Sequence, residues 1–242
     1  LKLGIECDPS PVPSSTEYDA VYCAGTPLSI AVSYRQHWQS KNWPVFLYSW
    51  DLYPYQVEDM LLSPASEVHF KPFLEELKKC RVAFVPSKCS VDNVRQYTGR
   101  GAEVIRASVR PFNVPVWDGG YVLDPLRKFG DPNRNLVSKV CKQLGMPCVE
   151  TGNSLCRSEW EKVVAGARIV VSSYYQASTG GLSLLEAYAL GKPVILSDSS
   201  RNGVVDYFGH ERPGVYYFQH DRKEDLRRVL QKVFYSPPVL DT

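Results

Sequence analysis

Apolar residues recur along the first half of the chain in two alternating patterns. Short apolar runs predict buried β-strands at residues 2–7, 20–24, 45–50, 82–85 and 104–105. Between them, apolar positions at helical spacing predict helices at 27–39, 68–79 and 90–97, with Ser87 or Ser90 as the cap of the last one. Strands that alternate with helices are typical of a parallel sheet covered by helices on both faces.

The second half of the chain repeats this alternation. Strands are predicted at 121–123, 148–150, 169–172, 194–196 and 215–218, and helices at 135–144, 158–165, 182–190 and 224–234. Between the halves, residues 110–119 contain proline and show no clear periodicity, which predicts a linker. We therefore predict an α/β chain of two Rossmann-like domains, residues 1–112 and 113–242.

Composition narrows the class of protein. The chain has 242 residues, is 44% hydrophobic and carries a net charge of only +2, so it is globular and nucleic acid is not the expected partner. No segment approaches the roughly 20 apolar residues of a membrane span, and no signal peptide opens the chain. We expect a cytoplasmic protein, with peripheral membrane contact and the oligomeric state left open.

Cysteine and histidine give no sign of a metal site. The seven cysteines form no C-x-x-C pair, and the four histidines are scattered singly. We interpret the cysteines mainly as reduced core thiols, and we expect neither a metal nor a resident cofactor.

Residues 179–200 have the most specific pattern. Gly180 and Gly181 open a helix at 182–190, and Glu186 lies one turn inside it. The unpaired N–H groups at a helix start favour an anion, and a carboxylate further along can accept hydrogen bonds from sugar hydroxyls. This arrangement suits a nucleoside diphosphate, with the phosphates at the glycines and the ribose at Glu186.

The same stretch resembles a known signature. Residues 181–187, Gly-Leu-Ser-Leu-Leu-Glu-Ala, and 191–195, Gly-Lys-Pro-Val-Ile, are similar to the donor-binding motif of retaining GT-B glycosyltransferases in the glycosyl transferases group 1 family (family 4-like). Residues 80–87 and 49–54 resemble segments of the family's N-terminal domain more weakly. The resemblance implies two Rossmann-like domains facing across a cleft, here with a shortened N-terminal domain. The family also has two glutamates in a Glu-x7-Glu spacing; Glu186 matches the second, and Ser178 stands at the first.

The resemblance implies donor-binding roles for several residues. In the family, an arginine and a lysine after the first strand of the donor domain stabilise the leaving diphosphate, which points here to the catalytic candidates Arg134 and either Arg127 or Lys128. Their alternative is a solvated basic loop. The full donor-binding set expected is Lys128, Ser178, Thr179, Gly180, Gly181, Leu182, Glu186 and Arg201. Thr179 has a helix cap as its alternative role, and Arg201 an exposed position.

An acceptor site is expected after the strand at 45–50. Asp51 is the candidate for orienting an acceptor hydroxyl and is counted with the catalytic residues. Trp50, Tyr53 and Tyr55 are candidates for stacking on sugar rings, and an aromatic cluster that packs the loop is the alternative.

Together these residues predict a retaining, metal-independent glycosyltransferase. It would move a sugar from a nucleotide-diphosphate donor to a hydroxyl of a glycan, a lipid or a small molecule. The alternative is a non-catalytic GT-B-like module that binds a nucleotide or glycan and supports a partner glycosyltransferase. Ser178 in place of glutamate, Trp50 where the family often has histidine, and the absence of the family's opening glycine-rich loop favour this alternative.

Overall fold

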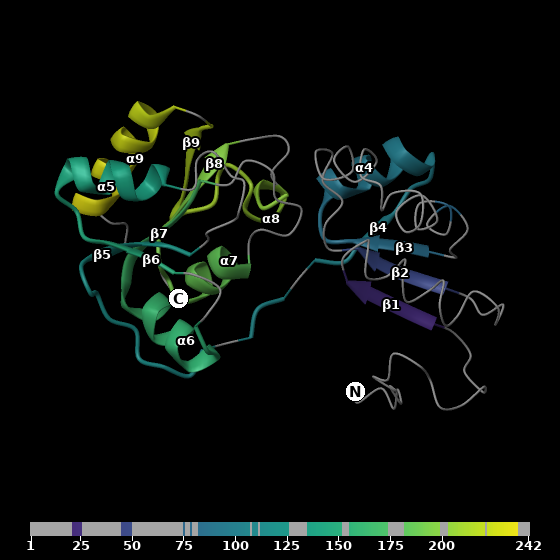
Figure 1. Cartoon of the computed structure of the whole chain (residues 1–242), viewed down its shortest axis with the longest axis horizontal. Helices are drawn as coiled ribbons and strands as arrows, with labels where there is room; N and C mark the ends of the chain where they lie inside the picture. Colours follow the sequence, from purple (N-terminus) through teal and green to yellow (C-terminus); the bar gives the residue numbers. More distant parts are fainter. Residues whose placement is uncertain are drawn as a thin grey trace. The chain divides into compact units, whose positions relative to one another are not determined.

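The protein consists of two compact units, residues 1–105 and 106–242, each with its own parallel sheet (Figure 1). The structure is a computed structural model that describes residues 21–25, 45–49, 75, 78, 82–106, 108–110, 112–125, 135–151, 155–173, 182–198, 203–220 and 222–236. The division that the sequence predicts at residue 112 stays a prediction.

The first unit contains a four-stranded parallel sheet in the order β1-β2-β3-β4. Its strands are β1 Val21–Gly25, β2 Val45–Ser49, β3 Val82–Val85 and β4 Glu103–Val104. Four of the five predicted strands are thus confirmed, and the first, at 2–7, lies outside the described residues together with the helix expected at 27–39. Within the helix expected at 68–79, the described residues Glu75 and Lys78 are helical.

Helix α4, Lys88–Thr98, follows β3 and is closed at both ends by local signals. The Ser87 hydroxyl accepts a hydrogen bond from the Ser90 backbone N–H at 3.2 Å, which confirms Ser87 as the N-cap. Gly99 ends the helix with φ of 70°, a left-handed conformation that glycine adopts without a steric penalty.

Replacing Ser87 with alanine is expected to destabilise the first unit by about 1 kcal/mol, because the first turn of α4 loses its side-chain acceptor. Urea unfolding of Ser87→Ala and of Lys88→Ala, an exposed position in the same turn, measures this effect. Equal midpoints for the two variants would show that the cap contributes nothing.

The second unit contains a five-stranded parallel sheet in the order β6-β5-β7-β8-β9. The strands are β5 Tyr121–Asp124, β6 Cys148–Glu150, β7 Ala167–Ser172, β8 Val194–Asp198 and β9 Val215–Gln219. The helices are α5 Leu136–Leu144, α6 Arg157–Gly166, α7 Leu182–Ala189, α8 Val205–Phe208 and α9 Lys223–Tyr235. All the strands and helices predicted for this half are confirmed, and α8 is an addition.

Helices cover both faces of this sheet, as expected for a doubly wound domain (Figure 1). One face packs against α5 and α9 through a core that includes Val140, Ile195 and Leu230. The other packs against α6, α7 and α8 through residues such as Leu123 and Leu184. In the first core, Cys141 and Cys148 are free thiols, and a hydrogen bond between them together with burial raises the pKa of Cys148. The α/β fold predicted from the sequence is therefore confirmed.

Hydrogen bonds hold the segment before β5 against the amino end of the second sheet. The Trp117 backbone N–H donates to the Ala165 carbonyl at 3.2 Å, and Lys192 Nζ donates to the Trp117 carbonyl at 2.6 Å. The pKa of Lys192 is lowered because the side chain is buried, and the nearby Asp118 carboxylate offsets part of this shift. Asp118 forms an ion pair with Arg168 at 2.8 Å, and the hydrogen bond from Arg168 lowers the pKa of the Asp118 carboxyl.

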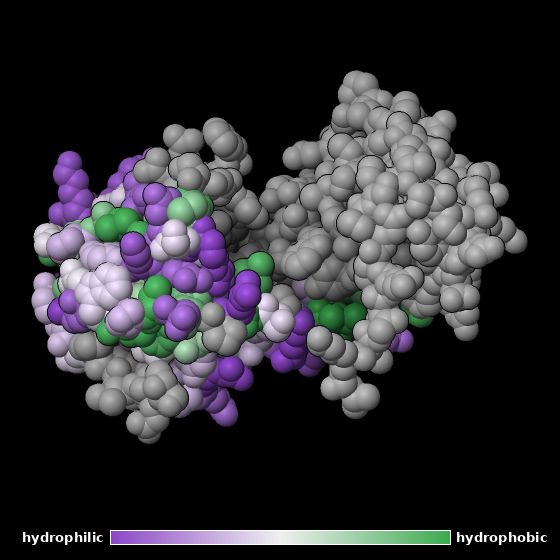
Figure 2. Space-filling view, turned by 90° about the horizontal axis from the view of Figure 1, so that it is seen from below, coloured by the Kyte–Doolittle hydropathy of each residue, from purple (hydrophilic) through white to green (hydrophobic). Residues whose placement is uncertain are grey.

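The surface of the second unit mixes polar and apolar residues. Hydrophilic and hydrophobic residues are interspersed over its coloured face in Figure 2. Val116 and Trp117 are the most exposed large apolar residues of the segment before β5, with 49% and 46% of their surface accessible. Within the part of the chain that the structure describes, no helix has the length and apolar character needed to span a membrane.

Candidate functional site

Polar side chains gather where the strands of the second sheet end. Each of the five strands contributes at least one such residue at or just after its carboxyl end, namely Asp124, Thr151, Ser172, Ser173, Ser197, Asp198 and His220. Apart from Asp198 and His220, these residues are almost fully buried. The Thr151 hydroxyl donates to the Pro125 carbonyl at 3.2 Å, and the Ser197 hydroxyl lies 3.3 Å from His220 Nδ1.

The strand order marks one position along this edge. From β5 the chain moves to β6 on one side and then to β7, β8 and β9 on the other, so the winding reverses between β5 and β7. Ligands of open α/β sheets bind at such a switch point, outside the carboxyl ends of the strands. Asp124 and Ser172 flank this point, at the ends of β5 and β7.

Most of the candidate residues lie outside the part of the chain that the structure describes. The catalytic candidates Asp51, Arg127 and Arg134 are outside the described residues, as are the acceptor candidates Trp50, Tyr53 and Tyr55. The same holds for the donor candidates Lys128, Ser178, Thr179, Gly180, Gly181 and Arg201. Of the predicted site, the structure describes Leu182 and Glu186, and the roles of the others stay predictions.

Leu182 and Glu186 lie in the first two turns of α7. Leu182 opens the helix and is 40% exposed. Glu186 comes four residues later, about 6 Å along the axis, and its side chain is 10% exposed. A buried carboxylate requires partners, because burial removes the water that would otherwise solvate its charge.

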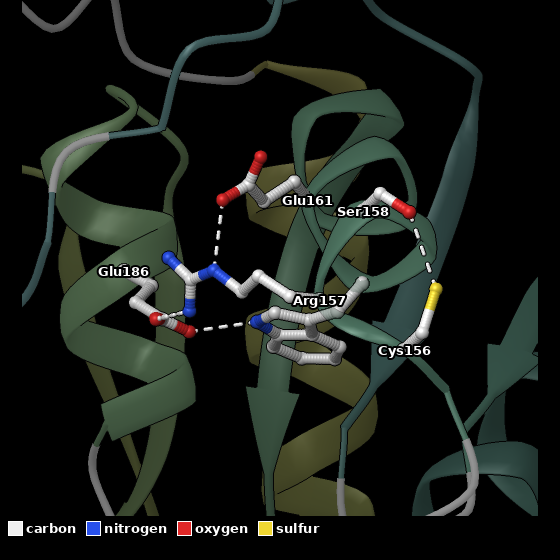
Figure 3. Close-up of polar contacts among 6 residues, drawn as sticks. Cys156, Arg157, Ser158, Glu161 and Glu186 are labelled. Carbon is white, nitrogen blue, oxygen red and sulfur yellow. Dashed lines mark hydrogen bonds and ion pairs between the residues drawn. The ribbon is translucent and has the colours of Figure 1, made fainter.

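Two residues of α6 supply those partners, one for each carboxylate oxygen (Figure 3). Arg157 Nη1 donates to Glu186 Oε1 at 2.5 Å, and Trp160 Nε1 donates to Glu186 Oε2 at 2.7 Å. The hydrogen bond to Glu186 is the main cause that raises the pKa of the Arg157 guanidinium above its already high ordinary value. The carboxylate is therefore charge-compensated and fixed in orientation.

Arg157 is itself held on two further sides. Its Nε donates to Glu161 Oε1 at 2.8 Å, one helical turn further along α6. Its guanidinium carbon lies 4.6 Å from the centre of the Phe112 ring, within the range of a cation–π contact. The Arg157 side chain remains 46% exposed. The cluster of Arg157, Trp160 and Glu186 is therefore open to solvent at Arg157 and closed at Glu186.

Within the described part of the chain, the Glu186 carboxylate keeps acceptor positions beyond those that Arg157 and Trp160 use. An ionised carboxylate has about four lone-pair positions. Arg157 and Trp160 each use one, on different oxygens, so each oxygen keeps a second position. Two acceptors on one rigid carboxylate match two neighbouring hydroxyl groups, such as those of a ribose.

The sequence predicts Glu186 as a site residue but did not lead to its partners Arg157 and Trp160. They lie three residues apart in the first turn of α6, with Arg157 directly before the helix predicted at 158–165, and therefore share a face. That spacing could have indicated a shared contact surface, but it does not show which helix the surface contacts. Among the described residues, no group of three or more His, Cys, Asp and Glu side chains could hold a metal ion.

Solved structures resemble this chain over most of its length. Sucrose-phosphate synthase from Thermosynechococcus elongatus superposes with a TM-score of 0.63 at 15% identity, over 91% of this chain and 65% of that one. TarM of S. aureus gives 0.65 at 16% identity, over 88% and 47%, and Anabaena HepE in complex with UDP and glucose gives 0.66 at 13%, over 91% and 69%.

These likenesses are structural, since no protein-family model matches the sequence and no curated protein matches it. The chain spans about two thirds or less of the first two of these solved chains. At this level of identity the matches show that the chain has the α/β fold of the GT-B glycosyltransferases.

Proposed function

We propose that this chain is a glycosyltransferase that moves a sugar from a nucleotide-diphosphate donor to an acceptor hydroxyl. The observation that supports this most is the likeness of about nine tenths of the chain to sucrose-phosphate synthase and to HepE, which was solved with UDP and glucose. The polar edge at the switch point and the fixed carboxylate of Glu186 lie in the second unit, where we place the nucleotide.

The chemistry that we propose is retaining and metal-independent. The leaving diphosphate gains charge in the transition state, and a helix N-terminus with cationic side chains can stabilise that charge. The start of α7 after Gly180 and Gly181, with Arg134 and Arg127 or Lys128, would take this role. The acceptor hydroxyl would be oriented by Asp51, with Trp50, Tyr53 and Tyr55 against its sugar rings. The resemblance of the sequence to the group 1 family (family 4-like), including its partial match to the Glu-x7-Glu motif, supports the same proposal.

Nucleotide binding and donor turnover test this proposal in sequence. Thermal shifts with UDP, GDP and ADP identify the base, and release of that diphosphate from its sugar nucleotides is then followed with and without glycan, lipid and small-molecule acceptors. Acceptor-dependent release establishes a transferase. Diphosphate binding without any turnover would favour the non-catalytic module, and no binding by any of the three would refute the proposal.

Turnover is expected to continue in EDTA, because the residues proposed at the diphosphate are cationic and replace a metal. The rate in the presence of EDTA should stay within about twofold of the untreated rate. Loss of transfer in EDTA that manganese or magnesium restores would contradict this expectation.

A further inference from the structure

Arg157 and Trp160 of α6 donate hydrogen bonds to Glu186, which is the one acidic side chain of α7 and is buried. Both belong to the first turn of α6, while Glu186 is in the second turn of α7. In parallel α/β units, each helix begins near the carboxyl end of the strand that it follows, here β6 and β7. The cluster therefore lies at the starts of two crossover helices, on the side of the sheet where α/β proteins bind ligands.

The geometry of the cluster is more specific than a contact between two helices needs. Apolar packing alone could hold α6 against α7, and Val164 and Leu184 already share a core on this face. The cluster instead surrounds a carboxylate with a guanidinium and an indole N–H, each at hydrogen-bond distance and each on a separate oxygen. Such an arrangement fixes the plane of the carboxylate as well as its position.

Fixing that plane has a consequence for a diol ligand. Two hydroxyl groups on neighbouring carbons can each donate to a separate oxygen of one carboxylate when both oxygens face the diol. Arg157 cannot easily turn away from Glu186, because Glu161 binds its Nε and the Phe112 ring lies against the guanidinium. Its positive charge also offsets the negative charge that Glu186 would otherwise present close to a diphosphate.

We infer that Arg157 and Trp160 are positioning residues that hold the Glu186 carboxylate in the orientation in which it recognises the two ribose hydroxyls of the donor nucleotide. The inference rests on the proposed function, since it assumes that a nucleoside diphosphate binds at the second unit. It adds to that proposal two side chains that act through Glu186 and make the site bind a ribonucleotide more tightly than a deoxyribonucleotide.

The test compares UDP with 2′-deoxy-UDP by calorimetry, or the guanine or adenine pair if that base binds more tightly. The wild-type protein should bind the ribonucleotide about 10-fold or more tightly, the effect of one hydrogen bond to a charged group. Trp160→Phe keeps the aromatic packing and removes the N–H donor, and Arg157→Gln removes the charge. In both variants the ribonucleotide should bind about 3- to 10-fold more weakly. The deoxyribonucleotide, which keeps its 3′-hydroxyl and its diphosphate, should weaken by a smaller factor, so the ratio of the two affinities should fall towards one.

A matched control comes from the same turn of α6. Glu159 accepts a hydrogen bond from the Cys156 backbone N–H at 2.9 Å and so stabilises the helix start without being bound to Glu186. Glu159→Ala should lower the melting temperature and leave the ratio of the two affinities at the wild-type value. A positioning role changes the ratio, which a purely structural role does not.

The outcomes separate the two proposals. If Trp160→Phe and Arg157→Gln weaken both nucleotides equally, or if the wild-type protein does not discriminate between them, the positioning role is refuted while the nucleotide site stands. If no diphosphate binds to the wild-type protein, the proposed function fails, and the positioning role fails with it.

Discussion

Replacing Glu186 with alanine is expected to weaken nucleoside diphosphate binding by about 1–3 kcal/mol, which is about 5- to 150-fold in Kd. The variant loses the two acceptor positions that Arg157 and Trp160 do not use and that we propose for the ribose hydroxyls. The hydrogen bonds concerned are charge-assisted, and such bonds are worth more than neutral ones. Calorimetric titration with the diphosphate that binds the wild-type protein measures the change.

A change in local charge could conceal this result, and a second ligand separates the two effects. Without Glu186, the Arg157 charge is no longer compensated from α7, which by itself favours any phosphate nearby. Inorganic pyrophosphate has the two phosphates and no ribose, so its affinity should stay the same or increase in Glu186→Ala. Glu186→Gln, which keeps the shape but loses the charge, should fall between wild type and alanine for the nucleotide. Nucleotide affinity that Glu186→Ala leaves unchanged would remove Glu186 from the site.

The strands of the second unit could be predicted because parallel strands are buried on both faces. Residues 194–196, Val-Ile-Leu, are all fully buried in β8, and such apolar runs are characteristic of this kind of sheet. Helix α8, with four residues, is too short to show a 3.6-residue period, and for that reason the sequence did not predict it.

The site could be predicted from the sequence only where its chemistry is local. Glu186 follows a glycine pair by a fixed spacing, so its helix and its position in that helix were available from residues 180–190. Its partners were not available, because Arg157 and Trp160 are 29 and 26 residues away and meet it through the packing of α6 on α7. The hydrogen bond between Lys192 and the Trp117 carbonyl spans 75 residues and was hidden for the same reason.

A second large effect is expected at Gly166, which ends α6 at the opposite end from Arg157. A methyl group there would lie 2.7 Å from Trp117 Cζ2 and 2.7 Å from Tyr121 Oη, closer than nonbonded atoms approach. Trp117 is 46% exposed, and its ring can rotate away. Tyr121 is held more firmly, because its hydroxyl donates to the Val163 carbonyl at 2.6 Å.

Gly166→Ala has two opposing effects on the free energy of unfolding, and their magnitudes decide whether the variant is more or less stable. Alanine restricts the unfolded chain and favours helix, which together would stabilise the protein by up to about 1 kcal/mol. Overpacking in a closely packed region costs about 1–3 kcal/mol, and here two side chains must move at once. We therefore expect the second unit to lose about 1–2 kcal/mol of its free energy of unfolding.

Urea unfolding of three single variants and one double variant tests this expectation. Gly166→Ala should unfold at lower urea than wild type, whereas Gly101→Ala, where an added methyl group meets nothing within 4 Å, should unfold at the same or a slightly higher concentration. Tyr121→Phe alone loses the hydrogen bond to Val163, but in the Gly166→Ala background it also removes the oxygen that the new methyl group meets. The double variant should therefore be more stable than the sum of the two single changes predicts. Strict additivity would show that Tyr121 is not the group that excludes a side chain at position 166.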